Sequence, residues 1–390
     1  MVTNSNKHSV KHIAPGATLG MLGGGQLGRM FAIAARRMGY RVLMFGDPSD
    51  SPAGQVCDRS WDASFTDFER LKEFAELVDV VSYEQENIPV ETVEFLMPLV
   101  PVRPGVDLLK ASQHRISEKT ALRSIGIPTA NFAPIRSETE LASVLPAFDG
   151  RGILKTTRMG YDGKGQVRIE CPDDAAEAWQ TLKTDEAILE EEIHFSHEIS
   201  IVAARFTNGD VTCFQPSVNQ HVNHILDVSV SPSELLNEST TKEAAEIARA
   251  VLEHFDAVGV LCVEFFVTAE GRLLVNEIAP RPHNSGHLTI DACCSCQFEQ
   301  QVRAICGMPS GNVFQAQPAA MINLLGDHLM TATPDRWNSL LHRPGVHVHM
   351  YGKAETRTGR KMGHLTVTAE SAQAAREMAI SARHVLMGIQ

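Results

Sequence analysis

The chain opens with a short apolar strand, a glycine-rich turn and a helix, and this unit limits what the chain can fold into. A strand, a helix and a second strand in this order build a parallel sheet, because the helix carries the chain back to the edge where the first strand began. The expected elements are a strand over residues 18–22, a turn over 23–28, a helix over 29–38, a strand over 41–45, a helix over 68–76 and a strand over 78–83. We therefore predict an N-terminal domain of the α/β class that ends near Arg115.

The glycine turn has two interpretations. Gly23, Gly25 and Gly28 fit the fingerprint of dinucleotide-binding domains, and Asp47 follows the second strand, where such domains bind ribose. Taken alone, this pattern suggests an NAD-dependent oxidoreductase. It also suits any other anion, because the N-terminus of a helix offers free N–H groups and a positive dipole end. The rest of the chain has to decide between the two.

Length and charge restrict the classes of partner. The 390 residues are enough for two or three domains. A formal net charge of −12 argues against nucleic acid, because an acidic surface repels phosphate backbones. A phosphorylated substrate would need a locally basic pocket, and Lys353, Arg357, Arg360 and Lys361 lie within nine residues of each other. The alternative for this basic run is a solvated hairpin.

The sequence favours a cytoplasmic protein without a membrane partner. Residues 1–12 are polar and lack the apolar segment of a secretory signal, and no run reaches the length of a membrane span. The eight cysteines are then expected as reduced thiols. Cys293 and Cys296 form a lone C-x-x-C without the second pair of a zinc site, and residues 290–305 are predicted as one helix. A buried cluster of metal-free thiols is therefore expected, formed by Cys293, Cys294, Cys296 and Cys306.

A lysine on a strand precedes a glycine-rich loop in the second part of the chain. Lys155 ends a strand over residues 152–155, and Gly160, Gly163 and Gly165 follow in the loop. Such a loop can present N–H groups to phosphates, and the lysine adds a positive charge. The alternative is an ordinary hairpin with a solvated tip.

An apolar strand over residues 187–193 then runs into acidic residues. Backbone groups of residues 190–193 could bond the edge of an adenine ring, and Glu198 could accept hydrogen bonds from ribose. A solvated sheet edge has the same pattern, so the residues alone leave both interpretations open.

Two glutamates are predicted to face each other on a hairpin over residues 262–278. A turn centred at 270–271 places Glu264 opposite Glu277, with Cβ atoms roughly 4.5–5.5 Å apart. Two opposed carboxylates repel each other, and a Mg²⁺ ion between them would reverse that sign, with Asn276 beside it. The alternatives are a bulge that turns one glutamate to solvent, or a protonated carboxyl group.

Pro280 and Pro282 force an extended chain directly after this hairpin. Alternation then sends Arg281 and His283 in the same direction. A rigid basic loop beside metal-binding carboxylates is a suitable place for an anionic intermediate.

Three separated stretches resemble one family of ATP-grasp ligases, the 5-(carboxyamino)imidazole ribonucleotide synthases. These stretches are residues 23–30, 275–287 and 359–364. The lysine strand, glycine loop, acidic strand and paired glutamates also resemble ATP-grasp ligases in order and spacing. The resemblance covers nearly everything from Thr18 onward. It implies an ATP-grasp fold with an N-terminal Rossmann-like parallel-sheet domain and a small C-terminal domain.

The resemblance also implies a reaction. ATP, bicarbonate and 5-aminoimidazole ribonucleotide would give ADP, phosphate and the carboxyamino product of purine biosynthesis, through carboxyphosphate and with Mg²⁺. A homodimer is implied as well. The expected domains are residues 1–115, an ATP-grasp domain over 116–312 with a lid at about 130–205, and a small domain over 313–390.

Roles follow for the residues that match the family. Those expected to bind ATP are Arg115, Lys155, Gly160, Tyr161, Asp162, Gly163, Lys164, Gly165, Gln166, Glu190, Glu191, Glu192, Ile193, Glu198, His221, Asn276 and Glu277. Those expected at the carboxylation site are Tyr161, Lys164, Arg281, His283 and Asn284. Those expected to bind the ribonucleotide are Gln26, Leu27, Glu84, Glu86, Lys353 and Arg360. The expected magnesium ligands are Glu264 and Glu277.

Three other functions compete with this one. An NAD-dependent oxidoreductase would explain the glycine turn but would leave Lys155, Glu264 and Glu277 without a role. A formate-using ligase of the same pathway would keep the fold and change the acid. A non-catalytic nucleotide-binding module would have no need for the lysine together with both glutamates.

Overall fold

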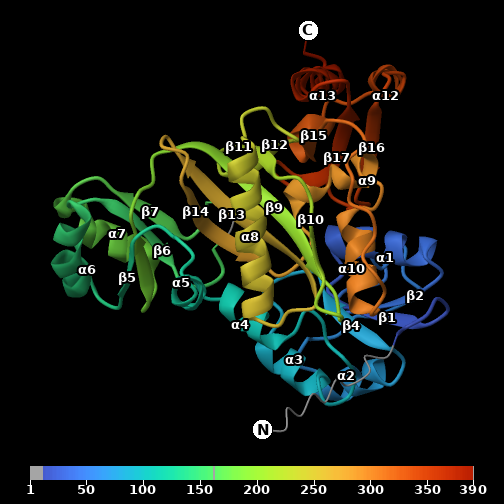
Figure 1. Ribbon diagram of the computed structural model, residues 1–390, viewed down its shortest axis with the longest axis horizontal. Helices are drawn as coiled ribbons and strands as arrows, with labels where there is room; N and C mark the ends of the chain where they lie inside the picture. The colour runs from blue at the N-terminus through green and yellow to red at the C-terminus, as the bar shows by residue number, and fades with distance from the viewer. Residues whose placement is uncertain (1–11, 161–162, 390) are drawn as a thin grey trace.

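The computed structural model describes residues 12–160 and 163–389, and the chain is built around three β-sheets (Figure 1). The N-terminal segment, in blue, lies beside the C-terminal segment, in red, and a separate green lobe lies at the opposite end of the molecule. None of the helices in these two ranges is long and apolar enough to cross a membrane.

The N-terminal sheet is parallel and has the strand order β3-β2-β1-β4. Its strands are β1 (Thr18–Leu22), β2 (Arg41–Phe45), β3 (Arg59–Trp61) and β4 (Val80–Tyr83). Its helices are α1 (Gln26–Arg37), α2 (Phe68–Ala75), α3 (Val90–Leu96) and α4 (Val106–Ser112). Every residue of β1 is buried, as expected for a parallel strand covered on both faces. The predicted alternation of strand and helix is confirmed.

The green lobe holds an antiparallel sheet in the order β5-β8-β6-β7. Its strands are β5 (Phe132–Ile135), β6 (Gly152–Thr156), β7 (Gln166–Ile169) and β8 (Ala187–Glu190). The helical segments of this lobe are α6 (Glu138–Val144), η1 (Leu145–Phe148), η2 (Pro172–Asp174) and α7 (Ala175–Leu182). Helix α5 (Arg115–Ser124) connects the lobe to the N-terminal unit.

A larger antiparallel sheet forms the centre of the molecule, in the order β14-β13-β9-β11-β12-β15-β17-β16, with β10 paired to β9. Its strands are β9 (Phe195–Arg205), β10 (Val211–Cys213), β11 (Ser217–Val222), β12 (Ile225–Ser231), β13 (Gly259–Thr268), β14 (Leu273–Ala279), β15 (Ala319–Leu325), β16 (Val346–Met350) and β17 (Lys361–Thr368). The sheet continues across the predicted boundary at residue 312, because β12 pairs with β15. The domain limits at 115 and 312 therefore stay predictions.

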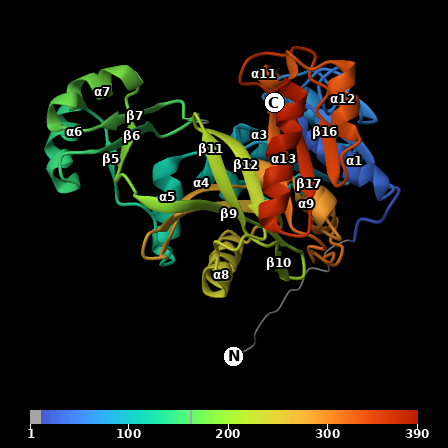
Figure 2. The same cartoon turned by 90° about the horizontal axis from the view of Figure 1, so that it is seen from above.

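Helices cover the central sheet and connect it to the N-terminal unit (Figure 2). Helix α8 packs on β9 and β13, and α13 packs on β15 and β17. Helix α10 packs against both α1 and β13, so it fixes the N-terminal unit against the central sheet. The helical segments of this part are α8 (Glu238–His254), η3 (Asn284–Gly286), α9 (Thr289–Ala292), α10 (Gln297–Ile305), α11 (Gly326–Leu329), α12 (Pro334–Leu341) and α13 (Ala372–Met387).

The single helix predicted over residues 290–305 is wrong. Helix α9 ends at Ala292, and α10 begins at Gln297. Between them the backbone bonds to a distant segment: the N–H of Cys294 donates to the carbonyl of Phe314 at 3.0 Å. Of the clustered thiols, Cys296 is buried and Cys294 is exposed, so the expected buried cluster is only partly formed.

Candidate active site

A cavity of about 970 Å³ lies where the N-terminal unit, the green lobe and the central sheet meet. It brings together most of the residues that the sequence singled out. Those that line it are Gln26, Leu27, Glu84, Glu86, Arg115, Lys155, Gly160, Gly163, Lys164, Gln166, Glu198, His221, Glu264, Asn276, Glu277, Arg281, His283 and Asn284. A single cavity therefore collects side chains that lie up to about 260 positions apart in the sequence.

Other predicted residues are not part of this lining. Among the described residues these are Gly165, Glu190, Glu191, Glu192, Ile193, Lys353 and Arg360. Tyr161 and Asp162 lie outside the described residues.

The glycine turn is occupied by carboxylates of the protein itself. The N–H of Gly24 donates to Asp47 Oδ2 at 2.6 Å, and the N–H groups of Gly25 and Gly28 donate to the two oxygens of Glu84. A Cβ at Gly25 would lie 2.6 Å from Glu84 Oε1, so glycine is needed for this approach. The turn therefore binds an internal anion, and its match to the dinucleotide fingerprint does not indicate NAD.

Glu84 is fully buried in this position. Burial raises the pKa of its carboxyl group to about 6, although the bonds from Gly28 and Gly25 act in the opposite direction. Its oxygens already accept two backbone N–H groups, so its predicted contact with the ribonucleotide would have to use the remaining lone pairs.

Lys155 and a second lysine hold Glu190 between them. Lys155 Nζ lies 2.8 Å from Glu190 Oε2, and Lys119 Nζ lies 3.5 Å from Oε1. Lys119 also donates to the carbonyl of Asn276 at 3.1 Å. Burial raises the pKa of Glu190, but the charges of Lys119 and Lys155 outweigh it and bring the pKa to about 2. The predicted adenine contact is therefore left to the backbone of this segment.

Sequence reasoning missed Lys119, although helix α5 carries a signal for it. Arg115, Glu118, Lys119 and Leu122 recur at the spacing of one helical face. Glu118, Lys119 and Leu122 are buried, so this buried face of α5 contains two charged residues beside the apolar Leu122. Charged side chains on a buried face require partners. For Lys119 these partners are Glu190 and the carbonyl of Asn276.

Glu264 and Glu277 are directly paired across β13 and β14, as predicted, but the turn is not the reason. Near the turn the register is shifted by one position, with Phe265 opposite Val275. A bulge at Asn276 restores the pairing of the two glutamates. The chain thus reaches the predicted arrangement by an irregularity that alternation does not reveal.

Each of these glutamates has a cationic partner, so the expected uncompensated repulsion is wrong. Glu264 Oε1 lies 2.8 Å from His283 Nε2, and Glu277 Oε2 lies 3.3 Å from an Arg115 nitrogen. Burial raises the pKa of Glu264, but His283 and other nearby cations outweigh it and lower the pKa to about 2. Burial lowers the pKa of His283, but Cys262 and Glu264 outweigh this effect and raise the pKa to about 10.

The donor set suits magnesium only together with a substrate. Among the described residues, no three His, Cys, Asp or Glu side chains are grouped as metal ligands. Mg²⁺ is commonly held by one or two carboxylates plus phosphate oxygens, and Glu264 and Glu277 provide two. These two glutamates therefore fit a magnesium ion that a nucleotide would help to coordinate.

The basic loop after β14 is held by acidic and amide groups. Arg281 Nε lies 2.5 Å from Glu86 Oε2, which links the central sheet to the N-terminal unit. Gln297 accepts from the N–H of His283 at 2.9 Å and donates to its carbonyl at 2.8 Å. Asn284 is paired with Asn323 of β15. As predicted from alternation, Arg281 and His283 both face the cavity.

The side of the cavity formed by β9 and β13 contains an aromatic pair that the sequence reading overlooked. The rings of Phe195 and Phe266 stack at 4.7 Å and both line the cavity. Next to them, His221 Nδ1 lies 2.7 Å from Glu198 Oε2. Phe266 follows Glu264 by two positions on β13, so strand alternation could have placed both on one face.

The basic run near the C-terminal end lies beside the cavity. Lys353 Nζ donates to the carbonyl of Lys361 at 2.7 Å, and Arg360 donates to the carbonyl of Glu355 at 2.9 Å. Burial, Arg360 and Lys361 lower the pKa of Lys353 to about 8. Lys361 lines the cavity, so this run reaches its edge. Its binding to phosphate stays a prediction.

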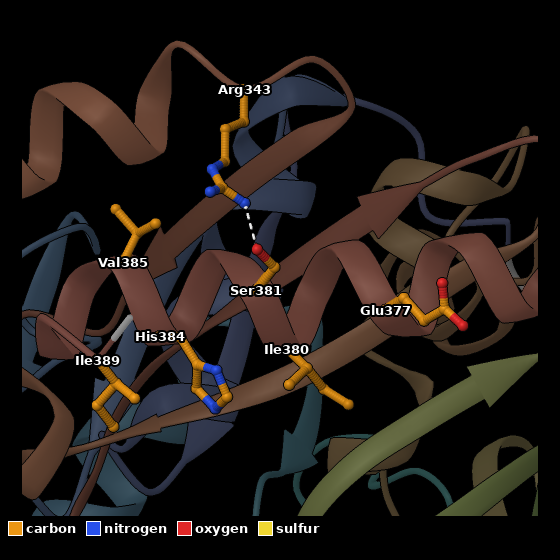
Figure 3. Close-up of a pocket in the computed structure, with 7 residues that line it drawn as sticks. All are labelled: Arg343, Glu377, Ile380, Ser381, His384, Val385 and Ile389. Atoms are coloured by element: carbon orange, nitrogen blue, oxygen red, sulfur yellow. Dashed lines mark hydrogen bonds between the residues drawn. The ribbon is translucent and has the colours of Figure 1, made fainter.

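A second hollow of about 430 Å³ lies on the outer surface of α13 and contains none of the predicted residues (Figure 3). Arg343 donates to Ser381 Oγ across it at 2.9 Å, and Ile380, Val385 and Ile389 provide an apolar lining.

Three protein families match successive parts of the chain. The Ribonucleotide synthetase preATP-grasp domain matches residues 16–113, the ATP-grasp domain matches 120–298, and the Phosphoribosylaminoimidazole carboxylase C-terminal domain matches 319–378.

Whole proteins and solved structures agree with these matches. The N5-carboxyaminoimidazole ribonucleotide synthase of Bacillus subtilis is 40% identical over 91% of this chain and 92% of that protein. The bifunctional purine synthesis protein purC/E of Dictyostelium discoideum is 40% identical over 94% of this chain, which spans 38% of that longer protein.

Among solved structures, the ADP complex of an N5-carboxyaminoimidazole ribonucleotide synthetase has a TM-score of 0.91 and 38% identity, covering 96% of this chain and 98% of that one. The Aspergillus clavatus enzyme in complex with ADP and 5-aminoimidazole ribonucleotide has a TM-score of 0.85 and 29% identity, covering 96% and 99%. The chain belongs to the N5-carboxyaminoimidazole ribonucleotide synthase family and has its ATP-grasp fold.

Proposed function

We propose that this protein is an ATP-dependent ligase that carboxylates 5-aminoimidazole ribonucleotide with bicarbonate in purine biosynthesis, through carboxyphosphate. Family membership supports this proposal. The observation that carries it is the single cavity lined by Lys155, the facing pair Glu264 and Glu277, and the basic loop with Arg281. ATP activation needs the first two features, and an anionic intermediate needs the third.

The nucleotide would lie on the side of the cavity formed by the green lobe and β9. Arg115 and Lys155 would contact its phosphates, the loop over residues 160–166 would cover them, and Glu198 with His221 would lie at the ribose. Glu264, Glu277 and Asn276 would hold Mg²⁺, whose charge would neutralise phosphate oxygens.

The ribonucleotide would lie between the glycine turn and the basic loop. Gln26, Leu27, Glu84 and Glu86 line this side of the cavity. Lys353 and Arg360 would bind its phosphate from the edge.

Carboxyphosphate loses its activation to water, so this chemistry requires an enclosed site. Tyr161 and Lys164 of the covering loop, with Arg281, His283 and Asn284 opposite, would surround the reacting groups. Arg281 would balance the charge of the intermediate, since Glu86 holds its guanidinium in place. We also propose a cytoplasmic homodimer.

One experiment tests the reaction. ADP and the carboxylated product are measured with ATP and Mg²⁺, with and without 5-aminoimidazole ribonucleotide and bicarbonate. We expect product only when both are present, in step with ADP. Formate-dependent ADP release without product from bicarbonate would instead identify the related ligase. Binding of NADH without binding of ATP would reject the ligase class.

A further inference from the structure

Asn284 meets the buried residue Asn323 edge to edge, in a reciprocal amide pair. The Asn284 Nδ2 group donates to Asn323 Oδ1 at 3.0 Å, and Asn323 Nδ2 donates to Asn284 Oδ1 at 2.5 Å. Asn323 lies on β15, and Asn284 begins η3 in the loop after β14, 39 positions earlier. Two hydrogen bonds in opposite directions hold the plane of each amide as well as its position.

The backbone carbonyl of Leu226 sets the orientation of this pair. Asn323 Nδ2 donates to that oxygen at 2.7 Å, and a carbonyl oxygen can only accept. Reversal of the Asn323 amide would bring its oxygen against the Leu226 oxygen. Since the Asn323 amide is fixed, Asn284 must present its Oδ1 to Asn323 Nδ2 and its Nδ2 to Asn323 Oδ1.

This arrangement determines what Asn284 offers to the cavity. An asparagine amide has two N–H groups and two acceptor positions, and the pair uses one of each. One N–H and one acceptor position of Asn284 remain for a ligand, in fixed positions. Asn284 lines the cavity, whereas Asn323 is 1% exposed and its amide bonds to Asn284 and to the Leu226 carbonyl.

We propose that Asn323 is a positioning residue for the carboxylation reaction, which acts by fixing the rotamer and amide polarity of Asn284. The proposal rests on the proposed function, in which Asn284 contacts the reacting groups. Without Asn323, the Asn284 amide could rotate by half a turn. In a fraction of the protein molecules it would then offer its oxygen where the reaction needs an N–H donor. A misplacement of about 1 Å at a reacting centre can lower turnover by about a hundredfold.

The decisive test is a double-mutant cycle of Asn323→Leu and Asn284→Ala. Leucine keeps a similar volume and removes all amide bonds. We expect Asn323→Leu to lower kcat at least about tenfold, with little change in KM for ATP. In the Asn284→Ala background the same substitution should have no further effect on kcat, since its route of action is gone.

A matched control separates positioning from general damage to the core. Gln300 is fully buried, donates to Ser295 Oγ at 2.9 Å and accepts from the N–H of Gly311 at 3.1 Å. Gln300→Leu should lower the melting temperature while kcat and the ratio of ADP to product stay at wild-type values. If Asn323→Leu does not fold, Asn323→Ser takes its place, because the smaller side chain leaves room for water beside Leu226.

Each outcome decides the question. Equal losses from the Asn323 substitution in both backgrounds, unchanged kcat in the single variant, or an equal kinetic loss in Gln300→Leu would overturn the proposal. Wild-type turnover in Asn284→Ala would overturn the role of Asn284 itself. Absence of any carboxylated product from the wild-type protein would reject the proposed function, a result distinct from all of these.

Discussion

Replacement of Glu190 by glutamine should destabilise the protein and yet strengthen its binding of ATP. The carboxylate is 3% exposed and lies between Lys155 Nζ, at 2.8 Å, and Lys119 Nζ, at 3.5 Å. Glutamine keeps the shape and removes the charge, so both lysines lose their counter-ion. In the unliganded protein this is a cost, because buried charges require partners.

The pKa of Glu190 gives the magnitude. A carboxyl group whose pKa is about 2 in the folded protein, against 4.5 for its ordinary value, contributes about 3 kcal/mol to folding at neutral pH. Loss of one partner from a buried ion pair costs a similar amount, about 3–5 kcal/mol. Burial already lowers the pKa of Lys155, so this lysine can release its proton in the variant and limit the loss. We therefore expect Glu190→Gln to lower the free energy of unfolding at neutral pH by about 3 kcal/mol.

The dependence on pH has a definite sign. The contribution of Glu190 in the wild type is fully present above its unfolded pKa of 4.5 and is lost as the pH falls toward about 2. The variant should lack this acid-sensitive part. Its own stability should recover as the pH rises, because Lys155, with its lowered folded pKa, binds more protons in the unfolded chain.

Affinity for ATP should change in the opposite direction. Lys155, no longer paired with Glu190, becomes available to ATP phosphates in the cavity, and their negative charge would hold its proton in the complex. Calorimetric titration with ATP and Mg²⁺, and urea unfolding with and without ATP, measure both effects. Glu94→Gln is the control, because Glu94 and Lys110 form an exposed pair of similar geometry, and we expect little change there. Weaker ATP binding by Glu190→Gln would refute the reasoning and indicate that its side chain contacts the nucleotide.

Three further substitutions test other parts of the site. Glu277→Gln should abolish ATP turnover in a folded protein, and wild-type magnesium dependence after replacement of both Glu264 and Glu277 by glutamine would disprove the metal assignment. Arg360→Ala should weaken ribonucleotide binding by about 1.5–3 kcal/mol in titrations, far more than ATP binding. Unchanged ribonucleotide affinity would show that the basic residues 353–361 form only a solvated surface. Gly163→Ala should raise the ratio of ADP to product, because φ is +76° at Gly163 and a Cβ there lies 2.4 Å from His224; an unchanged ratio with slower turnover would show that the loop only positions ATP.

Local periodicity was sufficient for the regular elements. The alternation of apolar strands and helices predicted the N-terminal parallel sheet, whereas the pairing of Glu264 with Glu277 was predicted from an assumed turn at residues 270–271. The position of the bulge at Asn276 escaped prediction, because a bulge depends on how β14 meets β13 and not on the pattern of β14 itself. The break before α10 escaped for the same reason, since it follows from a backbone bond between Cys294 and Phe314.

The glycine turn shows why a motif can indicate the right geometry and the wrong ligand. Its spacing predicted N–H groups directed at an anion, and this is what the structure has. The anion is Glu84, at the end of β4 and 56 positions beyond Gly28. Only the position of β4 next to β1 reveals it, and a fingerprint of six residues contains no information on that neighbour.

Four cations of the cavity are already paired with carboxylates before any ligand binds. The pairs are Arg115 with Glu277, Lys155 with Glu190, Arg281 with Glu86, and His283 with Glu264. An acidic chain can keep these cations in a buried cavity only if their charge is balanced there. An anionic ligand would then have to share each cation with a carboxylate or displace that carboxylate. If Glu264 and Glu277 held a magnesium ion, His283 and Arg115 would lose these carboxylates as partners. These two basic groups line the cavity and would then be available to an anionic substrate there.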